Sequence, residues 1–309
     1  MLSIASLLCA AALALPQDPG PLSAPPAELV EAFELDPFYA KHLDAGGIPI
    51  LASARVNDYA LFEARYLIDR MLAGREDLRT AIAEQKVRFA IMAPSEFTTD
   101  VPEHSDLSPP GYWDRRARGL GATRQRPCVS CGEENLLGYP GDPYAAENIL
   151  IHEFAHVVHE MGLRRVDETF QPRLSATYRA AMEAGLWEGK YAATNPSEYW
   201  AEGVQSWFDT NRVNDHDHNH VDTREELREY DPGLAALIEE VLGDPAWRYV
   251  RPRDRAEPAH LEGYDASAAP RFVWPERVLE AWRAWEASQQ EERDGEQQAV
   301  RQGSNSTER

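Results

Sequence analysis

The chain has 309 residues, of which 43% are hydrophobic and 27% are charged, a balance typical of a folded domain and not of a disordered tail. Its 52 Asp and Glu residues against 31 Lys and Arg residues give a formal net charge of −21, which opposes binding to nucleic acid or anionic lipid. Beyond the first residues, no apolar run approaches the roughly 20 residues that span a bilayer. We therefore expect a soluble acidic protein with no nucleic-acid partner and no membrane span.

The N-terminus has the pattern of a short secretory signal. Residues 2–15 are almost wholly apolar, and Ala12-Leu13-Ala14 matches the small-x-small pattern of a signal-peptidase site, although no Lys or Arg precedes the apolar run. We predict a signal peptide over residues 1–15, cleaved at residue 14 or nearby, and a secreted or periplasmic protein. Residues 16–26 are Pro-rich and predict a linker, which argues against the alternative of a buried N-terminal helix.

The next part of the chain contains two predicted strands and a predicted helix. Residues 47–56 predict a strand that leads into a helix from Asn57, where apolar residues recur at helical spacing as far as Leu72. Residues 86–93 predict a second strand. The polar stretch 94–141 is long for a loop without structure, so we expect an ordered covering or functional loop there.

The stretch 94–141 also contains a Cys-x-x-Cys pair, Cys128 and Cys131. In an exported protein an even pair of cysteines is most simply a disulfide. A zinc site would need a second pair or a nearby histidine, and a redox role would need a thioredoxin-like context. Neither is visible, so we predict a Cys128–Cys131 disulfide that stiffens the loop.

A helix predicted over residues 143–161 carries a metal-binding pattern; an Asp-Pro pair marks its start and Gly162 its end. His152 and His156 are one turn apart on the same face, close enough to bind one Zn²⁺. Glu153 lies beside them, where it can take a proton from a water. Apolar residues surround the histidines nearly all round, so the helix is buried, and a buried histidine pair needs a partner. A zinc site explains this pattern better than a solvent-facing amphipathic helix does.

A second helix, from Asn195-Pro196 to Phe208, is predicted to supply the third ligand. Glu198 and Glu202 share one face, whereas aromatic and apolar residues cover the others. Glu198 could instead cap its own helix together with Asn195, but this alternative leaves Glu202 unexplained. We predict that Glu198 binds the zinc and that Glu202 accepts a hydrogen bond from a ligand imidazole.

Other histidines are weaker candidates. His159 follows His152 by seven residues, and three ligands on one helix would span about 10 Å, too far for bonds near 2 Å to a single ion. We expect His159 to be a core or supporting histidine. The run Asp215-His-Asp-His-Asn-His220 is either a second, weaker metal site or a solvated polar turn.

The rest of the chain completes one predicted domain. Further helices are predicted from Asp231-Pro232 and from Pro275. Residues 288–309 are polar and predict a disordered tail. Residues 27–287 are therefore expected to form one α+β domain in which helices dominate the second half.

The two site helices together resemble the gluzincin metallopeptidases, and in particular the family of the anthrax lethal factor catalytic domain. The similarity covers His152-Glu-Phe-Ala-His156 and Tyr191-Ala-Ala-Thr-Asn-Pro-Ser-Glu-Tyr-Trp-Ala-Glu202, a small part of the chain. The resemblance implies a zincin-like fold with a small mixed sheet, and one Zn²⁺ per chain bound by the two histidines and Glu198. It also implies that Tyr191 faces the substrate and stabilises the oxyanion or protonates the leaving amine.

These features predict a secreted zinc endopeptidase acting on a peptide or protein. Glu153 would take the proton of a water whose pKa the zinc lowers, and zinc and Tyr191 would hold the oxyanion. Such peptidases bind substrate as an added strand on a sheet edge, which residues 86–93 or 119–122 could supply. The alternatives are a zinc hydrolase of a non-peptide amide or ester, and a non-catalytic binding protein braced by zinc. An intact base at Glu153 disfavours the last, and the sequence predicts no oligomeric state.

Overall fold

The structure, a computed structural model, describes residues 22–256 and 259–306. The predicted signal peptide and most of the predicted linker lie outside these residues. The fold is α+β, as expected, with one five-stranded mixed sheet and many helices. The described residues include no helix that is both long and apolar enough to cross a membrane.

The sheet has the strand order β1-β2-β3-β5-β4. Its strands are β1 (Lys41–Asp44), β2 (Pro49–Ala52), β3 (Arg88–Met92), β4 (Gly119–Leu120) and β5 (Cys128–Gly132). Strands β2, β3 and β5 run parallel, and β1 and β4 pair antiparallel with them at the two edges. Of the two segments that could offer a sheet edge to a substrate, residues 86–93 therefore form a central strand, and residues 119–122 contain an edge strand.

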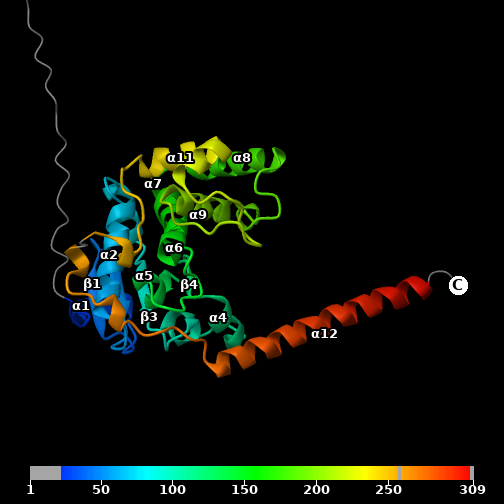
Figure 1. Ribbon diagram of the computed structural model, residues 1–309, viewed down its shortest axis with the longest axis horizontal. Helices are drawn as coiled ribbons and strands as arrows, with labels where there is room; N and C mark the ends of the chain where they lie inside the picture. The colour runs from blue at the N-terminus through cyan, green and yellow to red at the C-terminus, as the bar shows by residue number, and fades with distance from the viewer. Residues whose placement is uncertain (1–21, 257–258, 307–309) are drawn as a thin grey trace, which may run out of the picture.

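Helices cover the sheet and build a second group beside it. They are α1 (Ala27–Phe33), α2 (Asp58–Met71), α3 (Glu76–Ala83), α4 (Pro110–Arg116), α5 (Glu133–Leu137), α6 (Ile149–Val157), α7 (Arg164–Val166), α8 (Phe170–Glu183), α9 (Pro196–Trp207), α10 (Arg224–Tyr230), α11 (Pro232–Leu242) and α12 (Glu276–Ser306). Figure 1 shows α8, α9 and α11 together at one end of the molecule, the sheet with α1 and α2 at the other, and α6 between them. Helix α12 extends away from the body (Figure 1).

Alternate residues of the central strands face two different cores. Ile91 and Phe89 point to the larger core, which they share with α2 and α6, whereas Ala90 and Met92 point to a smaller one. Because both faces are buried, these strands are apolar throughout, as is usual for parallel strands.

The same alternation shows that the predicted disulfide is wrong. Cys128 and Cys131 are free and buried, and both belong to β5. Cys128 lies in the smaller core and Cys131 in the larger one, on opposite faces of the sheet. Residues three apart in a strand are separated by about 10 Å, beyond the roughly 7 Å that a disulfide allows between Cα atoms. The pair is therefore part of the hydrophobic core and does not stiffen a loop.

The Asx-Pro pairs do not all start helices. Asn195 and Asp231 are the N-caps of α9 and α11, as predicted. The pair at Asp142 is different: its carboxylate accepts from the backbone N–H of Tyr144 in a turn, and α6 begins only at Ile149.

Two other predicted boundaries also shift. Gly162 does not end the site helix but lies inside a π-helical turn, η3 (Val158–Leu163), that continues α6. The segment from residue 288, for which composition predicts disorder, is helical as far as Ser306 in α12. Its Glu, Gln, Arg and Ala residues are good helix formers, which composition-based expectations of disorder do not weigh.

Candidate metal centre

Helices α6 and α9 hold the candidate site, and apolar packing fixes both. Phe154 of α6 packs edge-on against Phe89 of β3, with ring centroids 5.3 Å apart. The indole of Trp200 on α9 is fully buried and donates to the backbone carbonyl of Ala155 on α6, at 3.0 Å. These contacts set which face of each helix meets the other.

The facing sides bring His152, His156 and Glu198 together. Glu198 Oε2 lies 3.2 Å from His152 Nε2 and 3.3 Å from His156 Nε2, and the two Nε2 atoms are 3.2 Å apart. Three ligands on a tetrahedral ion with bonds of 2.0–2.2 Å are separated by about 3.3–3.6 Å. The three donor atoms therefore fit one small tetrahedral metal ion, and they form a group that could bind one.

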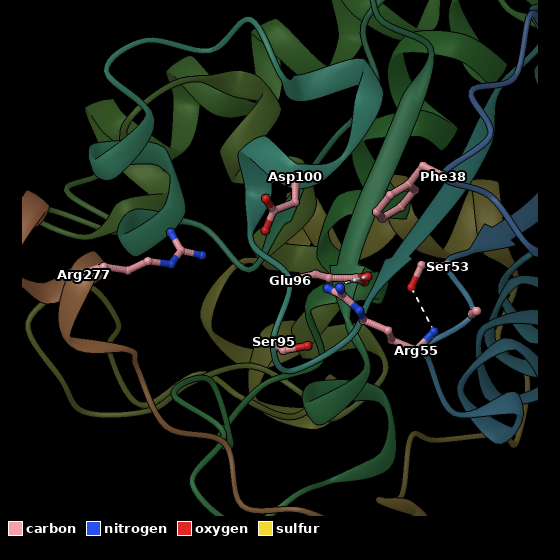
Figure 2. A pocket seen from close by; sticks show the side chains of 8 residues that line it. Phe38, Ser53, Arg55, Ser95, Glu96, Asp100 and Arg277 are labelled. Carbon is pink, nitrogen blue, oxygen red and sulfur yellow. Dashed lines mark hydrogen bonds and ion pairs between the residues drawn. The ribbon is translucent and has the colours of Figure 1, made fainter.

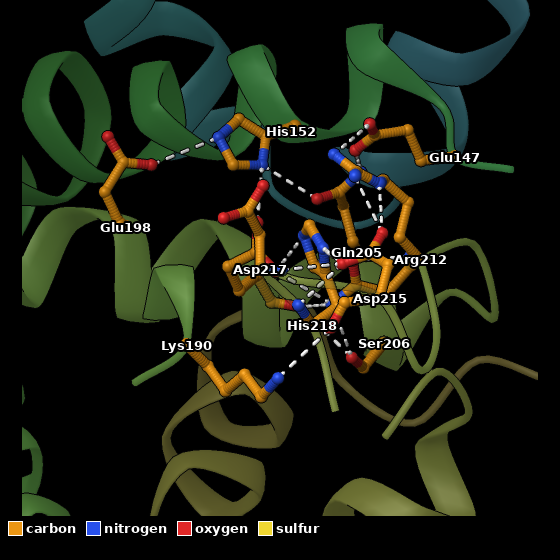
Figure 3. Close-up of polar contacts among 12 residues, drawn as sticks. Glu147, His152, Lys190, Glu198, Gln205, Ser206, Arg212, Asp215, Asp217 and His218 are labelled. Carbon is orange, nitrogen blue, oxygen red and sulfur yellow. Dashed lines mark hydrogen bonds and ion pairs between the residues drawn. The ribbon is translucent and has the colours of Figure 1, made fainter. Parts of the chain in front are cut away.

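The second nitrogen of each imidazole is also held in place. His152 Nδ1 lies 2.7 Å from Gln205 Oε1, and His156 Nδ1 lies 2.9 Å from Ser197 Oγ. Figure 3 shows His152 between Glu198 and Gln205. Metal-binding histidines usually donate their other ring N–H to an oxygen, which leaves the Nε2 lone pair for the metal. Gln205 is not among the residues predicted from the sequence, although it lies seven residues after Glu198, two turns along the same helix face.

Glu202 lies close to His152 but does not make its shortest contact. Glu202 Oε1 is 3.6 Å from His152 Nδ1, an ion-pair distance, whereas Gln205 makes the hydrogen bond. Glu202 Oε2 accepts from Asn211 Nδ2 at 3.1 Å and pairs with His218 Nε2 at 3.2 Å. Glu202 is therefore a buried carboxylate between His152 and the following loop.

Glu153, on α6, faces the chain segment that follows the edge strand β4. An ideal Cβ placed on Gly121, just after β4, would lie 3.1 Å from Glu153 Oε2 and 3.4 Å from His156 Cβ. Burial raises the pKa of Glu153, even though the neighbouring His152 and His156 charges act to lower it. A carboxylate with a raised pKa is suited to accept and return a proton near neutral pH.

Tyr191, in the turn η4 (Tyr191–Ala193) that precedes α9, lies beside His152. Its ring centroid is 6.4 Å from that of His152, and its backbone N–H donates to the carbonyl of Asp217 at 2.8 Å. Burial, together with the charge of Glu198, raises the pKa of Tyr191. The phenol therefore stays protonated and can donate a hydrogen bond.

The charges around the three donors favour a cation. Burial lowers the pKa of His152, but the hydrogen bond to Glu198 and the charges of Glu153 and Glu202 together raise it to about 10. Burial raises the pKa of Glu198, yet its hydrogen bonds to His152 and His156 bring it well below its usual range. A positive charge at this point is therefore stabilised, whether a proton or a metal ion carries it.

The other predicted candidates do not join the three donors. His159 is buried in η3, with Nε2 2.6 Å from Gln171 Oε1. His216 is exposed and pairs with its neighbour Asp217. Among the side chains that the structure describes, no second group of three metal-ligating residues converges.

A cavity of about 480 Å³ lies apart from the three donors, where β2 and β3 end (Figure 2). Arg55 and Arg277 line it together with Glu96, whose carboxylate lies 3.9 Å from Arg55. No residue of the metal centre lines this cavity.

No family model and no curated protein matches the chain. Among solved structures, a PRO-PRO endopeptidase from Paenibacillus alvei matches with 15% sequence identity and a TM-score of 0.36. The match covers 63% of this chain and 97% of that one. A likeness this remote carries no argument about fold or activity.

Proposed function

We propose that the chain is a zinc-dependent endopeptidase whose single Zn²⁺ is bound by His152, His156 and Glu198. The observation that carries this proposal is the convergence of three donor atoms, 3.2–3.3 Å apart, from two helices. Two imidazoles and one carboxylate are ligands that zinc prefers, and three protein ligands leave the open position of a catalytic site. A zinc ion that only braced the helices would have four protein ligands.

The residues around the donors supply the remaining chemistry. Bound zinc would lower the pKa of a water and polarise the scissile carbonyl. Glu153, whose pKa is raised by burial, takes the proton of the attacking water and returns it to the departing amine. Tyr191, kept protonated, donates to the oxygen on which negative charge develops.

The edge strand β4 supplies a place for the substrate backbone. It pairs only with β5 in the described sheet, and the chain after it runs past Glu153 and His156. An extended peptide added to this edge would place a peptide bond beside both residues. We therefore favour peptides over small amides or esters, which have no use for a strand edge.

Secretion is also a proposal, and it rests on residues 1–15 alone because the disulfide does not form. The intact mass of protein recovered from the culture medium tests it. A mature chain that starts near residue 15 is the expected result.

The variant Glu153→Gln tests the mechanism. We expect wild type to bind one zinc per chain and to cleave members of a mixed peptide library, as read by mass spectrometry. Glu153→Gln should keep the zinc and lose cleavage, because the amide cannot accept the proton. Glu160→Gln, on the π-helical turn η3, is the matched control and should cleave normally.

Each contrary result has a distinct meaning. Cleavage that survives in Glu153→Gln would refute Glu153 as the base. Hydrolysis of esters or acyl-amides without cleavage of any peptide would replace the peptidase with a non-peptide hydrolase. A folded wild type that takes up no added zinc would refute the proposal altogether.

A further inference from the structure

The loop after α9 contains the histidine-rich run that the sequence singles out, and one of its histidines is buried. His218 is 6% exposed, whereas the side chain of His216 is 96% exposed. His218 Nε2 lies 3.2 Å from Glu202 Oε2. Its Nδ1 lies 2.9 Å from Asp215 Oδ1, and Figure 3 shows these two residues side by side. Both ring nitrogens therefore face carboxylates.

A histidine between two carboxylates donates from both nitrogens and is then an imidazolium. Burial lowers the pKa of His218, but the hydrogen bond and charge of Glu202, followed by the hydrogen bond of Asp215, raise it overall. His218 thus neutralises Glu202, which is 2% exposed and lies behind the ligand His152. Without this cation, Glu202 would be a buried charge that keeps, among the described residues, the hydrogen bond from Asn211 and the longer contact with His152.

Asp215 holds both the loop and its histidine in one shape. Its Oδ1 accepts from the backbone N–H groups of Asp217 and His218, each at 2.8 Å, as well as from the His218 ring. Its Oδ2 accepts from Arg212 at 2.8 Å. The imidazole position is therefore set by several bonds within the loop and not by packing alone.

The same loop also holds the segment that carries Tyr191. The carbonyl of Asp217 accepts from the backbone N–H of Tyr191 at 2.8 Å. Lys190 Nζ donates to the carbonyls of Asp215 and His216, at 3.1 and 3.3 Å. Figure 3 shows Lys190 reaching into the loop from the side opposite His152.

We propose that residues 211–220 form a positioning loop for the metal centre rather than a second metal site. Through His218 it fixes Glu202 behind the ligand imidazole of His152, and through its backbone carbonyls it fixes Lys190 and Tyr191. The inference about Lys190 and Tyr191 rests on the proposed peptidase function. The inference about His218 and Glu202 concerns metal affinity and does not rest on it. The loop thus connects one metal ligand to the residue that would face the substrate.

The two halves predict different losses. Removing hydrogen-bond partners behind metal ligands typically lowers metal affinity or activity by about 10–100-fold. His218→Leu should lower zinc affinity within that range, because Glu202 then loses its cation. His218→Gln can still donate to Glu202 but carries no charge, so its zinc affinity should lie clearly below that of wild type and above that of His218→Leu. Lys190→Met should leave zinc affinity unchanged and lower kcat, because only the Tyr191 segment is loosened.

The experiment measures zinc affinity by competition with a chromophoric chelator, and kcat and KM on a peptide that wild type cleaves. The matched control is His216→Gln, an exposed histidine of the same loop, which should change neither quantity. Circular dichroism and thermal melting establish that each variant is folded. If His218→Leu does not fold, the intermediate affinity expected of His218→Gln still tests the proposal.

Wild-type zinc affinity in both His218 variants would overturn the positioning role, as would an equal loss in His216→Gln. Lys190→Met with wild-type kcat would overturn the Tyr191 half. If wild type binds zinc but cleaves nothing, the peptidase proposal fails, and the affinity comparison still decides the role of His218.

Discussion

Hydrogen bonds behind the ligands decide which nitrogen each site histidine offers to a metal. Gln205 Oε1 can only accept, so the nearby Nδ1 of His152 must carry the proton. Gln205 is itself oriented, because its Nε2 donates to Glu147 at 3.1 Å. The His152 ring is therefore held with Nε2 toward Glu198 and His156, so a metal ion replaces the proton on Nε2 and the ring does not have to turn.

The variant Gly121→Ala tests whether the exact position of the Glu153 carboxylate matters for cleavage. A methyl group at position 121 would lie 3.1 Å from Glu153 Oε2, so Gly121→Ala must displace the Glu153 carboxylate or the chain segment after β4. We expect peptide cleavage to fall roughly tenfold, because small misplacements of a reacting group are costly, while bound zinc stays at one per chain. Kinetics and metal analysis check this.

Gly233→Ala is the matched control for Gly121→Ala. Its added methyl would also lie 3.1 Å from its nearest neighbour, Thr177, but it stands on α11, which contributes no residue to the three metal-ligating side chains. An equal loss of activity in both variants would show that Gly121 acts only through general stability.

His104 makes stability depend on pH. Neither of its ring nitrogens has a hydrogen-bond partner in the described part of the chain, and it is 1% exposed. Burial, followed by the charge of Arg126, lowers the pKa of His104 from 6.5 to about 4, despite opposing charges from Glu103 and Asp106. Because its folded-state pKa lies below its unfolded value, folding loses stability as pH falls from about 6.5 to about 4.

Over that range protonation of His104 lowers the free energy of unfolding by about 3 kcal/mol, since each tenfold difference in proton affinity between the folded and unfolded states contributes about 1.4 kcal/mol. Urea unfolding at pH 7 and at pH 4 measures it, with His104→Leu as the comparison. The variant should lose less stability on acidification than wild type does. Equal losses would mean that His104 is not buried as a neutral side chain.

At the residue scale, the sequence predicts site residues whose spacing lies within one helix. It misses site residues whose partners lie on another helix or on a loop. His152, His156 and Glu198 could be found because each spacing is local to α6 or α9. Gln205 and His218 could not, because their partners depend on how these helices cross and on where the next loop folds back. No spacing rule connects His218 to Glu202, which lies sixteen positions earlier on a helix.

At the scale of elements, the N-cap of α9 connects stability to the metal centre. Asn195 Oδ1 accepts from the backbone N–H groups of Ser197 and Glu198, at 2.8 and 3.0 Å. Glu198 does not cap its own helix; its carboxylate is directed at the two histidines. The first turn of α9 therefore orients a candidate metal ligand.

Asn195→Ala should lower the free energy of unfolding by about 1 kcal/mol, the usual effect of losing such a cap. It should also weaken zinc binding, because the freed turn carries Glu198. Thr223→Ala removes the N-cap of α10, which supplies none of the three metal-ligating side chains, and should cost similar stability without changing zinc affinity. Urea unfolding in chelator and zinc titration separate the two effects. Equal zinc affinity in both variants would show that the α9 cap does not orient Glu198.

Elements that the sequence misses are those whose pattern is ambiguous. Asp142-Pro143 and Asn195-Pro196 look alike, but only the second starts a helix, because the Asp142 carboxylate is used by a turn and by Asn135. Strand β5 is hidden in Cys-Val-Ser-Cys-Gly, since a strand buried on both faces shows no alternation.

At the scale of the molecule, the metal centre joins two parts of the fold. Helix α6 packs against the sheet, whereas α9 belongs to the helical group with α8 and α11 (Figure 1). The strand order also decides which segment can offer an edge to a substrate. Strand β4 is an edge because β5 lies between it and β3. Strand order is a property of the whole sheet. It cannot be predicted from the sequences of residues 86–93 and 119–122 alone.

Zinc removal should therefore lower the stability of the whole domain. An ion bound only by the folded chain contributes about 2.7 kcal/mol when its free concentration is 100 times Kd, and a domain of this size shifts by about 2–4 °C per kcal/mol. We expect chelation to lower Tm by on the order of 5–10 °C. Glu198→Ala should melt at the same temperature with and without chelator, whereas Glu160→Gln should respond as wild type does. A wild-type Tm that ignores chelation would mean that α6 and α9 do not share an ion, because an ion held between them cannot leave without loosening both.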